Sequence, residues 1–82
     1  MTEDKADKPQ KRIFLDGFYI NYPATDEAYR VIKYLRDDLS SSETKVFFNQ
    51  ARVKGVAPFE DERERKYQIV YRGGMYSLEE QD

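Results

Sequence analysis

Residues 11–22 read KRIFLDGFYINY, with the Asp16-Gly17 pair between two runs rich in apolar, aromatic and β-branched residues. This pattern predicts a hairpin closed by a two-residue type I′ turn, because that turn needs a positive φ at both central positions. Leu15 then opposes Phe18, and side chains alternate between two faces. The face expected to join the core carries Ile13, Leu15, Phe18, Ile20 and Tyr22. The opposite face carries Arg12, Phe14, Tyr19 and Asn21.

Two helices are predicted after this hairpin. Thr25 is suited to cap the first, and apolar residues at helical spacing extend it over residues 26–39. The serines at 40–42 interrupt that pattern. Ser40 with Glu43, or Ser42 alone, caps a second helix over 43–54. A strand stays open as an alternative for 43–54, since a short apolar run fits either period.

The last third of the chain predicts three strands. Residues 56–61 form a short edge strand, because Pro58 cannot donate a hydrogen bond to a neighbour. Gly73-Gly74 then closes a hairpin between the strand that ends at Arg72 and the strand over 75–80. The whole order is ββ-α-α-βββ. We expect an α+β fold, with a small antiparallel sheet and two helices packed on one of its faces.

One domain is expected, because 82 residues are too few to divide into several. Residues 1–10 are polar and predict a disordered tail, and residues 11–80 form the single α+β domain. No apolar leader and no run of about 20 apolar residues is seen, so we expect a cytoplasmic protein without membrane contact.

The composition argues against an enzyme. Cys and His are absent, which excludes thiolate nucleophiles, imidazole bases and Cys/His zinc sites. The paired carboxylates fall at a helix end, in a turn and at the C-terminus, where water screens them. No phosphate-binding glycine loop or calcium loop is present. We therefore expect no catalysis, no cofactor and no metal.

Binding to another protein, or self-association, is the favoured function. Phe14 and Tyr19 with Arg12 and Asn21 would be exposed on the back of the first hairpin, a composition typical of interface hot spots. The alternative is that these aromatics belong to a second small core, or that the register differs by one residue. An open strand edge, around Pro58 or along 75–80, is the second candidate contact.

A single-stranded nucleic-acid-binding domain is the alternative function. Its cations would be Arg52, Lys54, Arg65, Lys66 and Arg72. Tyr67, Tyr71 and Tyr76 could stack on bases, although the alternation assigns them to the core face. The formal net charge of −2 makes this function less favoured than protein binding, since nucleic-acid binders carry a basic surplus.

Overall fold

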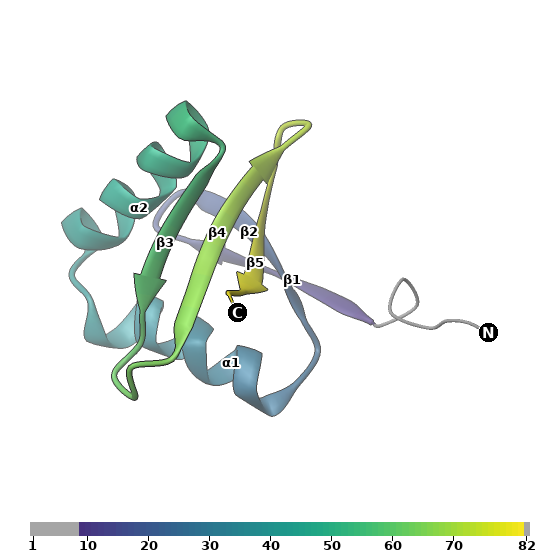
Figure 1. Ribbon diagram of the computed structural model, residues 1–82, viewed down its shortest axis with the longest axis vertical. Helices are drawn as coiled ribbons and strands as arrows, with labels where there is room; N and C mark the ends of the chain where they lie inside the picture. The colour runs from purple at the N-terminus through teal and green to yellow at the C-terminus, as the bar shows by residue number, and fades with distance from the viewer. Residues whose placement is uncertain (1–8, 82) are drawn as a thin grey trace.

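The predicted order of elements is confirmed in a computed structural model that describes residues 9–81 (Figure 1). The strands are β1 (Gln10–Leu15), β2 (Phe18–Pro23), β3 (Val56–Glu60), β4 (Lys66–Arg72) and β5 (Met75–Glu80). The helices are α1 (Asp26–Lys33), the π-helical segment η2 (Tyr34–Asp38) and α2 (Ser41–Lys54). A disordered tail was predicted over residues 1–10. Residues 1–8 lie outside the described part of the chain, and Gln10 is the first residue of β1.

The five strands form one mixed sheet in the order β1-β2-β5-β4-β3. The prediction of an antiparallel sheet was wrong at one junction, because β2 and β5 pair in parallel. A parallel pair needs a long crossover connection, which the helices and the β3–β4 hairpin provide between β2 and β5. The prediction that the last strand is an open edge was also wrong, since β5 lies in the middle of the sheet. The open edges are β1 and β3.

Both predicted hairpin turns are confirmed. Asp16 and Gly17 have φ angles of 49° and 95°, and the strands they join pair Leu15 with Phe18. Gly73-Gly74 joins β4 to β5, with Arg72 opposite Met75. Because β2 and β5 run parallel, these two turns lie at the same end of the sheet.

The core lies between the sheet and both helices. Phe48 of α2 is completely buried at its centre, with its ring centroid 4.6 Å from that of Phe18 and 5.0 Å from that of Tyr76. The first hairpin contributes Leu15, Ile20 and Tyr22, as predicted, and α1 contributes Ala28, Val31 and Ile32. The strands of the second hairpin contribute Tyr67, Ile69, Tyr76 and Leu78. The register predicted for both hairpins is therefore the register observed.

The two helices differ in detail from the prediction. The first was expected over 26–39, but it is α-helical only to Lys33, continues as the π-helical η2, and leaves Leu39 extended. The Leu39 amide donates a hydrogen bond to the carbonyl of Tyr34, five residues earlier, and this i to i−5 spacing defines the wider π-helical turn. The second helix begins at Ser41, with the predicted capping box of Ser40 and Glu43, so the strand alternative for this segment was wrong. Within residues 9–81, no helix is long and apolar enough to cross a membrane.

A buried threonine supports the η2 turn. The Thr44 hydroxyl, fully buried at the start of α2, donates a hydrogen bond of 2.8 Å to the Leu35 carbonyl. Thr44→Val keeps the shape but leaves that carbonyl without this donor, so the free energy of unfolding should fall by about 1–3 kcal/mol. Urea denaturation measures the change. A variant as stable as the wild type would show that the hydrogen bond does not support the turn.

Candidate functional site

The outer face of the first hairpin presents an exposed aromatic pair. Phe14 and Tyr19 are register partners on β1 and β2, and their side chains are 57% and 60% exposed. Their rings meet edge to face with centroids 4.9 Å apart. The neighbouring pair is polar, since the Arg12 guanidinium Nε donates to the Asn21 side-chain oxygen at 3.1 Å. These four residues form what we call the hairpin patch: Arg12, Phe14, Tyr19 and Asn21.

The hairpin patch continues onto the second hairpin. Asn21 is the register partner of Ser77, so Tyr19 lies beside Met75 across the parallel β2–β5 junction. Met75 is 39% exposed, and its partner on β4 is Arg72. The outer face therefore carries a row of side chains across four strands: Phe14, Tyr19, Met75 and Arg72. Alternation along β5 places Met75 on the outer face of the second hairpin, and the parallel junction brings it beside Tyr19.

The five cations of the nucleic-acid alternative divide between the two ends of the sheet. Arg65 forms an ion pair with Glu27 at the start of α1, and Lys66 lies opposite Glu60 on β3. Acids therefore accompany both bases at that end. The remaining three lie at the end that carries the hairpin turns: Arg52, Lys54 and Arg72.

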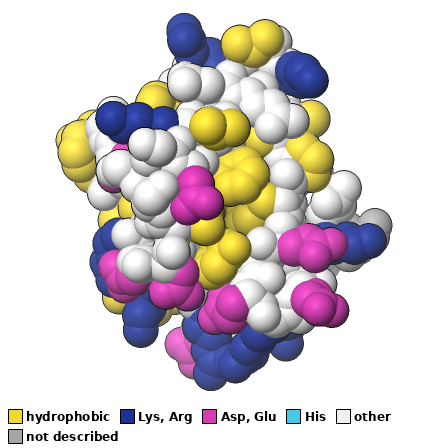
Figure 2. All heavy atoms as spheres, turned by 90° about the vertical axis from the view of Figure 1, so that its left-hand side faces the viewer, with side chains coloured by type: hydrophobic (Ala, Val, Ile, Leu, Met, Phe, Trp, Pro, Cys, Tyr) yellow, Lys and Arg dark blue, Asp and Glu magenta, His cyan; other side chains and the backbone are white. Residues whose placement is uncertain are grey.

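The last turn of α2 and the β4–β5 turn bring basic side chains to the same end of the sheet. Arg52 and Lys54 lie in the last turn of α2, which Gly55 joins to the second hairpin through a 3.0 Å bond from the Tyr71 amide to the Gly55 carbonyl. Figure 1 shows the end of α2 and the β4–β5 turn together at the top of the molecule. Figure 2 shows Lys and Arg side chains at that top without acidic side chains between them. The end of α2 and the end of β4 therefore bring Arg52, Lys54 and Arg72 to one end of the sheet.

The three tyrosines of the second hairpin belong to the core side. Tyr67 and Tyr76 are buried, and Tyr71 is half-buried against the same cluster, with its ring centroid 4.8 Å from that of Tyr76. They are not available to stack on bases. The stacking part of the nucleic-acid hypothesis was therefore wrong for these residues, for the reason that the strand alternation indicates.

Burial of these phenols gives the fold an alkaline limit. Burial raises the pKa of Tyr67, with a further contribution from Glu80, and burial also raises the pKa of Tyr76. In the unfolded chain a tyrosine ionises near pH 10, roughly, so ionisation favours unfolding. Stability should be complete below that pH and fall as the pH rises above it. Urea midpoints measured across this range test the expectation. A midpoint that stays constant would contradict it.

The acidic pairs have structural or solvent-exposed positions. Asp61 is only 8% exposed, and its carboxylate oxygen accepts hydrogen bonds of 2.9 Å from the backbone amides of Arg63 and Arg65. It therefore shapes the β3–β4 loop. Asp37 pairs with its exposed neighbour Arg36, which lowers the pKa of that carboxyl. Within the described part of the chain, no three acidic side chains are grouped in a way that could hold a metal ion.

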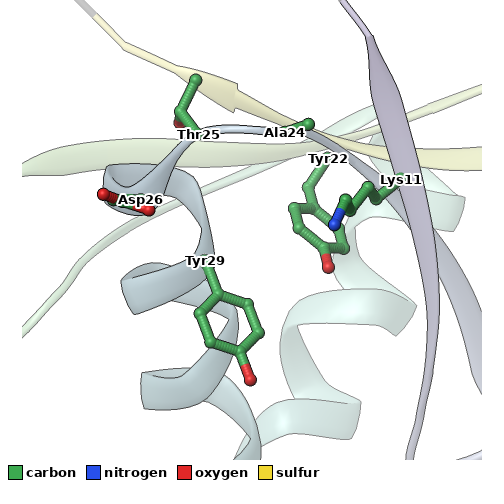
Figure 3. A pocket seen from close by; sticks show the side chains of 6 residues that line it. All are labelled: Lys11, Tyr22, Ala24, Thr25, Asp26 and Tyr29. Carbon is green, nitrogen blue, oxygen red and sulfur yellow. The ribbon is translucent and has the colours of Figure 1, made fainter.

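A hollow of about 350 Å³ opens between the first hairpin and α1 (Figure 3). Its wall includes Lys11 and Tyr22 on one side and Tyr29 of α1 on the other. Figure 3 shows the Asp26 carboxylate at the opposite side of the hollow from the Lys11 amine. Four expectations stay predictions: that the protein has no enzyme activity, that it has no cofactor, that it makes no membrane contact and that it is cytoplasmic.

Comparisons with protein-family models, with curated proteins and with solved structures find no significant match to this chain. The candidate site therefore rests on its own geometry.

Proposed function

We propose that this protein is a small non-enzymatic binding domain that recognises another protein through the hairpin patch and Met75. The observation that supports it most is the exposure of Phe14 and Tyr19, both more than half open to solvent although apolar residues are scarce in this chain. Two adjacent exposed aromatics beside an arginine have the composition of an interface hot spot.

The rigidity of the patch supports the same function. Both aromatics lie on the paired β1–β2 ladder, one pair from its turn, and the opposite face of this ladder is anchored in the core by Leu15 and Ile20. Little conformational entropy is then lost when a partner docks, since tyrosine and phenylalanine have few rotatable bonds and the strands are already ordered.

A single-stranded nucleic acid is the second candidate ligand, and one observation favours it. Arg72 lies in the same row as the exposed aromatics, and Arg52 and Lys54 lie at the same end of the sheet. Phe14 and Tyr19 would then take the stacking role that the buried tyrosines cannot have. Of the five candidate cations, only three lie at this end, which is why we place this function second.

Affinity capture with the tagged full chain, from a lysate of its own source, separates the two functions. Parallel captures use untreated lysate and nuclease-treated lysate. A defined protein that is retained after nuclease treatment, and that the Phe14→Ser/Tyr19→Ser variant fails to retain, is the expected result. Recovery of nucleic acid, or of proteins that disappear with nuclease, would contradict the protein-binding function. Direct binding to a single-stranded oligonucleotide, with an affinity that falls steeply with salt, would then establish the alternative.

A further inference from the structure

The outer edge of β1 carries unpaired backbone groups. The Ala24 amide donates to the Pro9 carbonyl at 3.1 Å, which fixes the alternation of the β1–β2 ladder. In an antiparallel ladder, the backbone N–H and C=O of every second residue bond to the partner strand. The N–H and C=O of the residues between them point away from that strand. Lys11, Ile13 and Leu15 therefore bond to β2. The amides and carbonyls of Gln10, Arg12 and Phe14 point outward from the sheet.

The sequence of β3, the other edge strand, disfavours the addition of a further strand. The bond from the Tyr71 amide to the Gly55 carbonyl fixes the ladder between β3 and β4 in the same way. By this alternation Val56, Pro58 and Glu60 point their backbone outward, and Pro58 has no amide proton to donate. A proline in the outward position prevents another strand from adding to β3. Within residues 10–15 no proline interrupts β1.

We propose that two copies of this chain pair antiparallel through β1, with Ile13 of one copy directly opposite Ile13 of the other. In this register the outward groups of Arg12 bond to those of Phe14 of the second copy, and the two-fold symmetry repeats the exchange. The pairing also keeps the outer faces of the two sheets on the same side, because each outer-face residue of β1 stands opposite an outer-face residue of the second copy.

The side chains favour this register over the one that pairs Arg12 with itself. Arg12 stands opposite the exposed Phe14 ring of the second copy, which permits a cation–π contact on each side of the symmetry axis. A shift that pairs Arg12 with itself would place two guanidinium groups directly opposite each other, which is unfavourable. On the inner face, Ile13 is half-buried against the core and would meet its own copy.

The pairing would give one sheet of ten strands with both hairpin patches adjacent on its outer face. The inference rests on the free edge of β1, and Arg12 and Phe14 of the hairpin patch also help to set its register. Pairing and partner binding can fail separately, because the dimer needs the outward amides at the edge of the sheet, whereas the partner of the proposed function contacts the face.

Cysteine cross-linking tests the register, because the chain contains no cysteine of its own. Ile13→Cys would place two thiols at a position where opposite Cβ atoms lie about 4.5–5.5 Å apart, close to the range that a disulfide spans. Val53→Cys is the matched control, since Val53 on α2 is 78% exposed and reports random collisions. At about 10 μM protein under mild oxidation, the Ile13→Cys chain should form covalent dimers about tenfold faster or more, because pairing raises the local thiol concentration toward about 1 mM. Equal rates would overturn the proposal.

A second variant keeps the test independent of any damage at Ile13. Arg12→Pro removes an outward amide that makes no bond to β2, at a position comparable to that of Pro58 on β3. Sedimentation velocity of the full chain should show a dimer for the wild type and a monomer for Arg12→Pro with unchanged circular dichroism. A wild-type monomer throughout the micromolar range would overturn the proposal. So would a dimer that folded Arg12→Pro retains, because another surface would then hold it.

Discussion

Replacing Phe48 with alanine should lower the free energy of unfolding by about 3–5 kcal/mol, the usual cost of removing a fully buried phenylalanine. The ring is completely buried, stacks on Phe18 and meets Tyr76 edge to face. These contacts join α2 to the strands on both sides of the parallel junction. A chain of this length has a total stability of about 4–12 kcal/mol, so much of the population could unfold.

Phe14→Ala is the matched control, because it makes the same change on the outer face of the sheet, where the ring is 57% exposed. It should cost about 1 kcal/mol or less, which is the usual contribution of a cross-strand pair. Thermal or urea denaturation of both variants gives the comparison. Similar losses for the two would mean that Phe14 is a core residue and that the hairpin patch is not a free surface.

The largest expected effect on function comes from the Phe14→Ser/Tyr19→Ser double variant. If the aromatic pair is the centre of the interface, its removal should weaken partner binding by at least about 2 kcal/mol, roughly thirtyfold. The free energy of unfolding should change little, since both side chains are already exposed in the folded state. Titration of the captured partner measures the affinity, and urea denaturation measures the stability.

Val46→Ser/Val53→Ser is the control for this variant. Both valines lie on α2 and are 60% and 78% exposed, so the change removes a comparable exposed apolar surface from a different element. This variant should bind as the wild type does. A loss of affinity as large as that of the hairpin variant would show that exposed apolar residues contribute to binding wherever they lie. The hairpin patch would then not be a specific site.

Local sequence signals predicted the hairpins, the capping box and the exposure of the aromatic pair. Asp16-Gly17 sets both the turn and the register, and the register determines which side chains face the helices. Ser40 with Glu43 caps α2, which begins at Ser41, two residues before the predicted start. These features depend on neighbours in the sequence, so a single chain is enough to read them.

The features that were missed depend on contacts between distant segments. The parallel pairing of β2 with β5 joins residues more than 50 positions apart, and nothing in either strand specifies it. That pairing moves β5 from the edge to the middle of the sheet and brings Met75 beside the hairpin patch. The π-helical η2 also depends on a distant partner, since the Thr44 hydroxyl bonds to the Leu35 carbonyl.

The central claim is that the hairpin patch is the contact surface, and amide chemical-shift mapping tests it most directly. The isotope-labelled full chain would be titrated with the nuclease-resistant partner recovered by capture. We predict that the largest shifts occur at Phe14, Tyr19 and Met75 and at their neighbours on the outer face of β1, β2 and β5. Shifts confined to α2, or to the hollow beside Tyr29, would contradict the account and place the contact elsewhere.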